Sequence, residues 1–285
     1  MVGHEGIGSQ TGLLGVLGHP IAHTLSPRMH NAALKAQGVD MVYLAFDVPP
    51  EGLGAAVSGM RALGFRGCNV TIPHKEAIGA LLDEVDTMAA RIGSVNTVVN
   101  EAGRLKGHNT DVSGFIAALR GLRPDGAAGL RCFVAGAGGA ARGVVAALQL
   151  EGAAEILVVN RTHERAVSLC AQASAWGSAP CVAVPVADGA AAAEGVDLLV
   201  NATAIGLTSY FKESALPVDT LNSRHIVMDL VYASGKVTEL VREAKARGAT
   251  AIDGKEMLLM QAAGSYELWT GRPAPVDVMR RSISE

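Results

Sequence analysis

One short segment, Gly136-Ala137-Gly138-Gly139-Ala140, constrains the fold of this chain more than any other. It follows the apolar run 131–135, which predicts a strand, and it opens the stretch 139–150, which predicts a helix. Ala141 fills the third small position of a dinucleotide fingerprint. Glycine in such a loop lets backbone N–H groups approach a pyrophosphate at the positive end of the helix. The segment therefore predicts a dinucleotide site, and a tight strand–helix turn without a ligand is the alternative.

The residues after the next predicted strand, 155–159, indicate which dinucleotide binds. An NAD site would place Asp or Glu there to accept a hydrogen bond from the ribose 2′-hydroxyl. This chain has Asn160-Arg161-Thr162 instead, followed by Arg165. A carboxylate would repel a 2′-phosphate, whereas a planar guanidinium can hold it with two charge-assisted hydrogen bonds. The pattern favours NADP over NAD, and a solvated arginine at a helix start is the alternative.

Short apolar runs alternate with helix-like segments along the chain, which is typical of βα units with a mostly parallel sheet. The first part predicts strands at 13–17, 41–48, 65–70 and 94–100, and helices at 26–37, 51–63 and 75–82. The second part predicts helices at 112–120, 139–150 and 164–173, and strands at 131–135, 155–159, 196–200 and 226–230. The tail from Gly254 onward is helical by its apolar period. We expect an α/β protein.

Length and composition indicate two modules and exclude several partner classes. The 285 residues suffice for roughly two domains, and the Gly- and Pro-containing stretch 121–129 would join them. A net charge of -3 gives no reason to expect nucleic acid or an anionic membrane as partner. The run 132–150 is a poor membrane span because it carries Arg142 and four glycines, and no signal peptide is visible. The four cysteines form no CxxC pair, which fits a reducing cytoplasm. We expect a cytoplasmic protein that binds a small molecule.

Polar residues in the first part are candidates for chemistry beside such a cofactor. Hydride transfer between a nicotinamide and an alcohol needs a group that moves a proton on or off the oxygen. The segment 69–75, Asn-Val-Thr-Ile-Pro-His-Lys, follows a predicted strand end, and Asn96-Thr97 and Asn109-Thr110-Asp111 follow later. A lysine and an aspartate brought together would shift each other's pKa. Taken singly, each of these residues is equally a turn or surface residue.

No metal site is expected. His19 and His23 have the spacing of a metal pair, but Pro20 lies between them and no glutamate completes an HExxH motif. We interpret them as residues of a turn. His74 is interpreted as a packing or surface histidine and the cysteines as buried small hydrophobes.

Seven blocks in order carry a resemblance to a known family. They are 18–27 (GHPIAHTLSP), 69–75 (NVTIPHK), 93–97 (GSVNT), 109–111 (NTD), 136–140 (GAGGA), 160–162 (NRT) and 257–261 (MLLMQ). Together they closely resemble the shikimate/quinate dehydrogenase family from about residue 13 to about residue 280. The resemblance implies reversible reduction of 3-dehydroshikimate to shikimate with NADPH, in the pathway to aromatic amino acids.

The resemblance also implies a domain division and a set of site residues. We expect a substrate-binding domain over 1–111, completed by C-terminal helices in 250–285, and a Rossmann-like NADP-binding domain over 112–249. Lys75 and Asp111 match the family's catalytic pair. The implied substrate-binding residues are Thr24, Ser26, Thr71, Asn96, Tyr232 and Gln261. The implied NADP-binding residues are Gly136, Ala137, Gly138, Gly139, Ala140, Asn160, Arg161, Thr162, Arg165, Thr203 and Gly254.

Departures from the family's pattern leave alternatives open. Thr24 stands where shikimate-specific members usually carry serine, and its extra methyl would favour another ring acid such as quinate. The segments 207–211 and 233–238 also differ from the usual pattern, which would alter the wall beside the nicotinamide. A quinate or dual quinate/shikimate dehydrogenase is therefore one alternative, and a ligand-sensing module without turnover is another. A monomer and a homodimer are both compatible with the resemblance.

Overall fold

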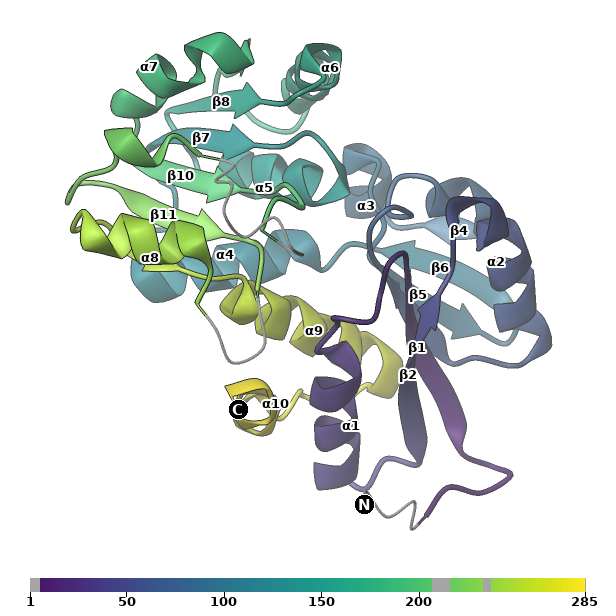
Figure 1. The fold of residues 1–285 in the computed structure, drawn as a ribbon. Helices are drawn as coiled ribbons and strands as arrows, with labels where there is room; N and C mark the ends of the chain where they lie inside the picture. The colour runs from purple at the N-terminus through teal and green to yellow at the C-terminus, as the bar shows by residue number, and fades with distance from the viewer. Residues whose placement is uncertain (1–5, 207–215, 233–236, 285) are drawn as a thin grey trace. The chain divides into compact units, whose positions relative to one another are not determined.

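The computed structural model describes residues 6–206, 216–232 and 237–284. Its chain divides into two compact units (Figure 1). The first contains the chain up to Thr110 together with Gln261 onward, and the second runs from Asp111 to Met260. The helix α9 (Lys255–Thr270) begins in the second unit and continues into the first.

The first unit is built on a six-stranded mixed sheet with the order β2-β1-β3-β5-β6-β4. Its strands are β1 (Gly12–Gly18), β2 (Met41–Asp47), β3 (Gly67–Val70), β4 (Glu84–Val85), β5 (Thr97–Glu101) and β6 (Arg104–His108). Strand β1 pairs in parallel with β2 and β3, whereas β5 is antiparallel to β3 and β6. Ala102 and Gly103 connect β5 to β6 with positive φ angles of 52° and 92°, as a two-residue hairpin turn requires.

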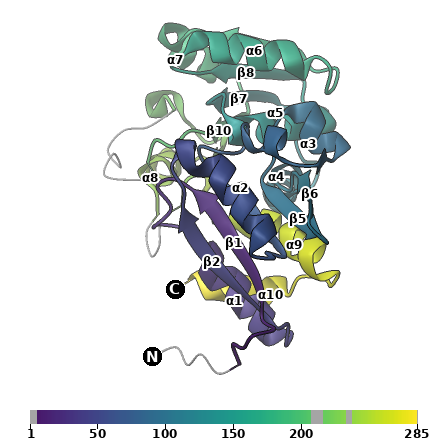
Figure 2. The ribbon, with the colours of Figure 1, turned by 90° about the vertical axis from the view of Figure 1, so that its right-hand side faces the viewer.

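Helices complete the first unit around an apolar core. They are α1 (Ser26–Ala36), the 3-10 turn η1 (Pro50–Gly52), α2 (Leu53–Ala62), the 3-10 turn η2 (Ile78–Leu81), α3 (Thr87–Ile92), the end of α9, and α10 (Val276–Ser284). Helix α10 packs against α1, beside which it lies in Figures 1 and 2. Trp269 on α9 donates a hydrogen bond to the carbonyl oxygen of Val98 at 3.0 Å. The C-terminal residues are thus part of the first unit's core.

The second unit contains a six-stranded parallel sheet with the order β12-β11-β10-β7-β8-β9. Its strands are β7 (Arg131–Ala135), β8 (Glu155–Val159), β9 (Cys181–Val184), β10 (Leu198–Asn201), β11 (Ile226–Asp229) and β12 (Thr250–Ile252). Its helical segments are α4 (Asp111–Leu122), α5 (Gly139–Leu150), α6 (His163–Ala173), η3 (Val186–Asp188), α7 (Gly189–Glu194), η4 (Val218–Thr220) and α8 (Glu239–Ala246). The strand order reverses at β7, which is the Rossmann arrangement.

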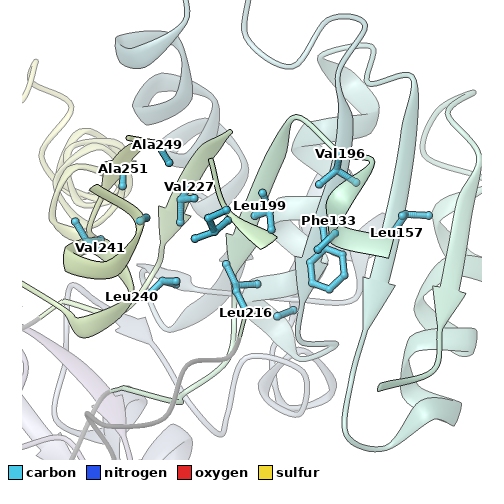
Figure 3. Close-up of a cluster of buried hydrophobic side chains, with 14 residues drawn as sticks. Phe133, Leu157, Val196, Leu199, Leu216, Val227, Leu240, Val241, Ala249 and Ala251 are labelled. Carbon is cyan, nitrogen blue, oxygen red and sulfur yellow. The ribbon is translucent and has the colours of Figure 1, made fainter. Parts of the chain in front are cut away.

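Buried apolar residues on the strands explain why this sheet is covered by helices. Strand β10 is buried over its whole length, as expected of a parallel strand packed on both faces. Figure 3 shows Phe133, Leu199 and Val227 from three neighbouring strands in one core, with Leu240 of α8 packed against them. Within the described part of the chain, no helix combines the length and apolarity needed to cross a membrane.

The structure corrects part of the sequence-based prediction. The helix predicted at 75–82 is reduced to turns and η2, because the carbonyl oxygen of Lys75 accepts from the N–H of Val95 at 2.8 Å. The strand predicted from residue 94 starts at Thr97. Residues 250–252, assigned to the first module, form β12 of the second sheet and pair with β11. The helix predicted at 26–37 is α1, which begins at Ser26 and ends at Ala36.

Candidate functional site

Two loops of the first unit are joined at the carboxyl ends of β1 and β3. The N–H of Thr71 donates to Leu17 O at 2.9 Å, and the N–H of His19 donates to Ile72 O at 2.9 Å. A Cβ at Gly18 would lie only 2.4 Å from Cγ2 of Thr71, so this position requires glycine. Polar residues gather at this end of the sheet, where ligands of open α/β sheets bind.

Lys75 is fixed at its main chain and is half-buried. Its carbonyl oxygen accepts from Val95, as described above, and the preceding His74 is buried. His74 Nε2 lies 2.6 Å from Val48 O. Because a carbonyl oxygen can only accept, this nitrogen carries the proton. His74 therefore anchors the segment that carries Lys75.

Thr24 and Ser26 form a local turn at the start of α1. The Thr24 hydroxyl lies 3.2 Å from Ser26 Oγ, and the N–H of Ser26 donates to Thr24 Oγ1 at 3.3 Å. Ser26 is buried and Thr24 is half-buried. The two hydroxyls thus lie next to each other.

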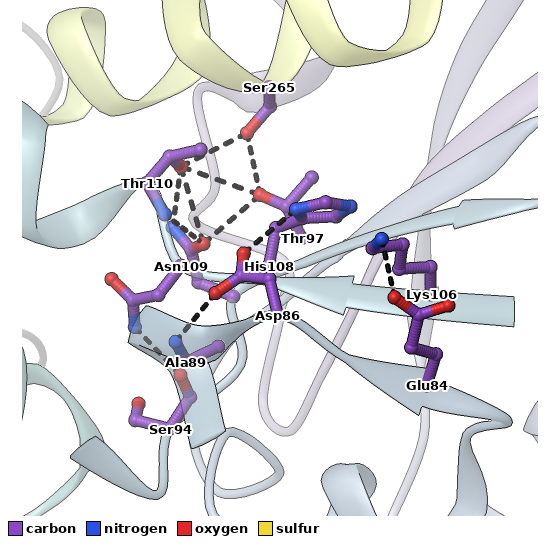
Figure 4. Close-up of polar contacts among 11 residues, drawn as sticks. Glu84, Asp86, Ala89, Ser94, Thr97, Lys106, His108, Asn109, Thr110 and Ser265 are labelled. Carbon is purple, nitrogen blue, oxygen red and sulfur yellow. Dashed lines mark hydrogen bonds and ion pairs between the residues drawn. The ribbon is translucent and has the colours of Figure 1, made fainter. Parts of the chain in front are cut away.

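Asn96 is the centre of a largely buried group of side chains, which we call the Asn96 cluster; Figure 4 shows three of its members, Thr97, Thr110 and Ser265. Its members are Asn69, Asn96, Thr97, Thr110, Gln261 and Ser265. Asn96 Oδ1 accepts from the N–H of Thr110 at 2.8 Å, and Asn96 Nδ2 donates to Thr110 Oγ1 at 2.9 Å and to Gln261 Oε1 at 3.2 Å. Ser265 Oγ lies 2.7 Å from Thr97 Oγ1. The cluster therefore joins α9 to the strand ends.

Two further side chains extend the Asn96 cluster into the core, and the sequence did not identify them as functional. The Tyr43 hydroxyl donates to Asn69 Oδ1 at 2.7 Å. His30 stacks on the Tyr43 ring with centroids 4.4 Å apart, and burial lowers the pKa of His30 to about 3. Ser265 was also missed, although it lies one helical turn after Gln261 and therefore on the same face of α9. Tyr43 carries no comparable sequence signal.

Asp111 is the first residue of α4 and is buried. It directly follows Thr110, whose main chain and side chain belong to the Asn96 cluster. A Cβ at Gly143 on α5 would lie 3.1 Å from Asp111 Cβ, so a glycine there permits the close packing of α4 on α5. At the start of α4, hydrogen bonds to the Asn96 cluster hold Thr110, and close packing on Gly143 holds Asp111. Gly143 is a further positioning residue that the sequence patterns did not single out.

The glycine loop of the second unit has the geometry that its sequence predicts. Gly136 has φ of +115°, and a Cβ there would lie 2.9 Å from Ala202 O, so no other residue fits without strain. Gly138 is extended and α5 begins at Gly139 with no side-chain cap. Ala137 is buried, whereas 138–140 are half-buried. A helix start without a side-chain cap, preceded by this loop, suits a phosphate group.

The loop 160–165 leaves the sheet next to the glycine loop. Ala135 and Val159 are paired in register, so the residues that follow them emerge side by side. Asn160 Nδ2 donates to Thr162 O at 2.8 Å and the N–H of Arg165 donates to the same oxygen at 3.1 Å, which shapes a turn. Arg161, Thr162 and Arg165 are exposed. Both arginines therefore lie at the surface of this edge of the sheet.

A third polar turn follows β10. Thr203 donates through its N–H and hydroxyl to Asn201 Oδ1, at 3.0 and 2.7 Å, and Asn201 Nδ2 donates to Asp229 Oδ1 at 2.8 Å. Burial raises the pKa of Asp229. Gly254 lies beside Leu230, whose carbonyl oxygen would be 2.2 Å from an added Cβ. These contacts place Thr203 and Gly254 at the carboxyl end of the same sheet as the glycine loop.

The remaining predicted residues are only partly described. Tyr232 is half-buried after β11. Of the segments that depart from the family's pattern, 207–211 and the first four residues of 233–238 lie outside the described residues. Among the described residues, no group of three or more His, Cys, Asp or Glu side chains has the arrangement of a metal site.

Comparisons with known proteins cover the chain almost completely. Three family models match: the shikimate dehydrogenase substrate binding domain at 16–98, shikimate / quinate 5-dehydrogenase at 123–232, and the shikimate 5'-dehydrogenase C-terminal domain at 254–283. A shikimate dehydrogenase (NADP(+)) of Moorella thermoacetica is 48% identical over 281 residues, which is 97% of this chain and 94% of that protein.

Solved structures agree with these sequence matches. A shikimate dehydrogenase crystallised with NADP+ has a TM-score of 0.89 and 38% identity, over 97% of this chain and 96% of the other. The shikimate 5-dehydrogenase of Thermus thermophilus, in complex with NADP(H) and shikimate, has a TM-score of 0.84 and 40% identity, over 95% and 98%. The similarity therefore extends over both units.

Proposed function

The chain belongs to the shikimate dehydrogenase family, and we propose that it catalyses the reversible, NADP-dependent reduction of 3-dehydroshikimate to shikimate. The observation that carries this proposal is the nearly full-length match to a shikimate dehydrogenase (NADP(+)) at 48% identity. NADPH supplies the hydride. The residues of this chain bind the two reactants and move the proton.

The first unit is proposed to bind the substrate. Thr24, Ser26, Thr71, Asn96 and Gln261 offer the donors and acceptors that a ring acid with several hydroxyls requires, and Tyr232 is proposed as a further substrate-binding residue. Both N–H groups of the Asn96 amide donate within the Asn96 cluster, one to Thr110 and one to Gln261. A substrate hydroxyl would therefore replace the longer of these bonds, the one to the half-buried Gln261.

Lys75 and Asp111 are proposed as the acid–base pair. The Lys75 ammonium would donate a proton to the substrate's carbonyl oxygen as it becomes a hydroxyl, and would recover that proton in the reverse direction. The Asp111 carboxylate would accept a hydrogen bond from the same hydroxyl and orient it toward the lysine. The anchored main chain of Lys75 and the tight packing of Asp111 on Gly143 support these roles.

The second unit is proposed to bind NADP. The pyrophosphate would lie at the start of α5 on the backbone of 136–140, with Thr203 and Gly254 at the same end of the sheet. Asn160, Arg161, Thr162 and Arg165 would surround the 2′-phosphate. The fit rests on a glycine loop that excludes any Cβ at Gly136 and on the exposed guanidinium of Arg161 at the adjacent strand end.

The reaction is tested by following NADPH or NADH absorbance with shikimate and with quinate, in all four combinations of acid and cofactor. We expect the highest kcat/KM with shikimate and NADP. Equal rates with quinate would contradict the substrate assignment and support a dual dehydrogenase. No turnover with any combination would support the ligand-sensing alternative. A Lys75→Ala variant should lose roughly 10²- to 10⁴-fold in kcat, the usual contribution of a general acid–base group.

The cofactor assignment is tested by Arg161→Ala. Loss of charge-assisted hydrogen bonds to the 2′-phosphate costs about 1.5–3 kcal/mol, so KM for NADP should rise roughly ten- to a hundredfold. KM for NAD should stay unchanged, because NAD lacks that phosphate. Arg104→Ala, which removes an exposed arginine of the first unit, is the control. An equal loss with both cofactors would show that Arg161 does not contact the 2′-phosphate.

A further inference from the structure

Two cysteines of the second unit lie in direct contact. Cys170 is near the end of α6, and Cys181 opens β9, the edge strand of the parallel sheet. The Cys181 thiol donates to Cys170 Sγ across 2.9 Å. Both cysteines are in the reduced form. Neither side chain has a role in the proposed dehydrogenase reaction.

We propose that Cys170 and Cys181 form an oxidisable dithiol site, which a small hydroperoxide converts to a disulfide that links α6 to β9. Cys170 is 7% exposed and Cys181 is half-buried. This limited access favours a small oxidant such as hydrogen peroxide over a bulky disulfide. Sequence spacing alone gave no indication of the pair, because 11 residues separate the two cysteines.

The hydrogen bond between the two thiols assigns their order of reaction. The Cys181 S–H group lowers the pKa of Cys170, and the same hydrogen bond, together with burial, raises the pKa of Cys181. Since the thiolate is the nucleophile, Cys170 attacks the peroxide first. Cys181 remains protonated and in contact, where it can resolve the product.

The chemistry balances in two steps. The Cys170 thiolate attacks one peroxide oxygen, the O–O bond breaks, and a sulfenic acid and a hydroxide ion form. Cys181 sulfur then attacks Cys170 sulfur, so that the S–S bond forms and the S–O bond breaks. The hydroxyl leaves as water with the Cys181 proton, and the hydroxide takes the proton first released by Cys170. Overall, two thiols are oxidised and one peroxide is reduced to two waters.

The other two cysteines provide an internal comparison. Cys68 and Cys132 are both fully buried, and burial raises the pKa of each thiol, to about 12 for Cys132. Cys68 Sγ contacts the sulfur of Met60, and Cys132 Sγ contacts the carbonyl oxygen of Leu130. These thiols lack a neighbouring thiol in contact and should stay reduced.

The full chain is treated with hydrogen peroxide, denatured in the presence of an alkylating agent and digested with trypsin. One tryptic peptide, 166–212, contains both Cys170 and Cys181 and no other cysteine. We expect this peptide to lose both alkylation sites and the mass of two hydrogen atoms, and dithiothreitol to restore both sites. Cleavage after Trp176 should then release two fragments that stay joined until they are reduced. The peptides with Cys68 and Cys132 should remain alkylated.

Two single variants test the order of the steps. Cys181→Ser should stop at a sulfenic acid on Cys170, which dimedone traps, and Cys170→Ser should leave Cys181 alkylated at the same peroxide dose. Cys132→Ala is the matched control and should still form the disulfide. The proposal is overturned if peptide 166–212 of the parent protein keeps both alkylation sites as long as the Cys132 peptide does. This comparison within the parent protein holds even where a variant fails to fold.

Discussion

At the scale of single residues, buried hydrogen bonds hold the Asn96 cluster in place. Asn69 is buried, and its amide group is surrounded by partners: Tyr43 on the oxygen side, and Thr97 and Ser265 on the nitrogen side. Removing one partner of a buried polar group lowers the free energy of unfolding by more than the hydrogen bond itself contributes. The remaining group then has neither its partner nor water to bond to. A substitution that removes one polar atom without changing the shape of the side chain should therefore destabilise the cluster.

Tyr43→Phe tests this point by removing one hydroxyl. The ring and its stack on His30 remain, but Asn69 Oδ1 loses its donor inside the core. We expect the free energy of unfolding to fall by about 1–3 kcal/mol, measured by urea denaturation, and KM for shikimate to rise. Tyr266→Phe is the matched control: its hydroxyl donates to Gln37 Oε1, which is half-buried and can bond to water instead. A larger loss in Tyr266→Phe would contradict the argument.

Some site residues could be identified from the sequence, whereas others could be identified only from their contacts in the structure. Lys75, Asp111 and Asn96 stand in motifs that a family resemblance makes visible. Tyr43 lies in an ordinary apolar strand, and its contact with Asn69 arises only when β2 and β3 flank β1 in the folded sheet. Likewise, Cys170 and Cys181 meet only because α6 packs beside β9. Contacts between elements are not encoded in local spacing, so these residues required the structure.

At the scale of elements, the strands and helices with a clear apolar period were predicted well, whereas β6, β9, α8 and the shortest elements were not predicted. Strands such as β7 and β8 are continuous apolar runs bounded by glycine or polar residues, which is a strong local signal. Strands β4 and β12 have two and three residues and no such period. Helix α3 was also missed, although Asp86 caps it by accepting from the N–H of Ala89 at 2.7 Å. An aspartate before a helix is a recognisable N-cap signal. The six residues of α3 carry only a weak apolar period, so the sequence analysis did not predict this helix.

Gly136→Ala tests the link between β7 and α5. Ala at Gly136 would combine a positive φ with a Cβ 2.9 Å from Ala202 O. Gly129→Ala is the matched control, since Gly129 has φ of +73° and no atom within 4 Å of an added Cβ. The control should lose about 1–2 kcal/mol of stability from backbone strain alone. Gly136→Ala should lose more and should also bind NADPH more weakly in a fluorescence titration. Equal effects of both variants would show that the contact with Ala202 has no consequence.

At the scale of the whole molecule, the two units differ in how the chain builds them. The second unit is one continuous segment, and all six strands of its sheet follow one another within it. The first unit is completed by residues from Gln261 onward, which supply Gln261 and Ser265 to the Asn96 cluster and Trp269 to the core. The proposed cofactor-binding residues therefore come from one segment, whereas the substrate-binding residues proposed in the first unit come from both ends of the chain.

A fragment from Asp111 to Met260 should accordingly fold alone. It contains the whole parallel sheet with its helices, and about 150 residues are enough to bury a core of their own. A second fragment that ends at Thr270 keeps α9 intact and controls for damage to this helix. We expect both fragments to unfold cooperatively by circular dichroism and to bind NADPH, more weakly with Arg161→Ala, but to oxidise no shikimate. If neither fragment unfolds cooperatively, the second unit depends on the first for its stability. That result would contradict the prediction that the second unit folds and binds NADPH by itself.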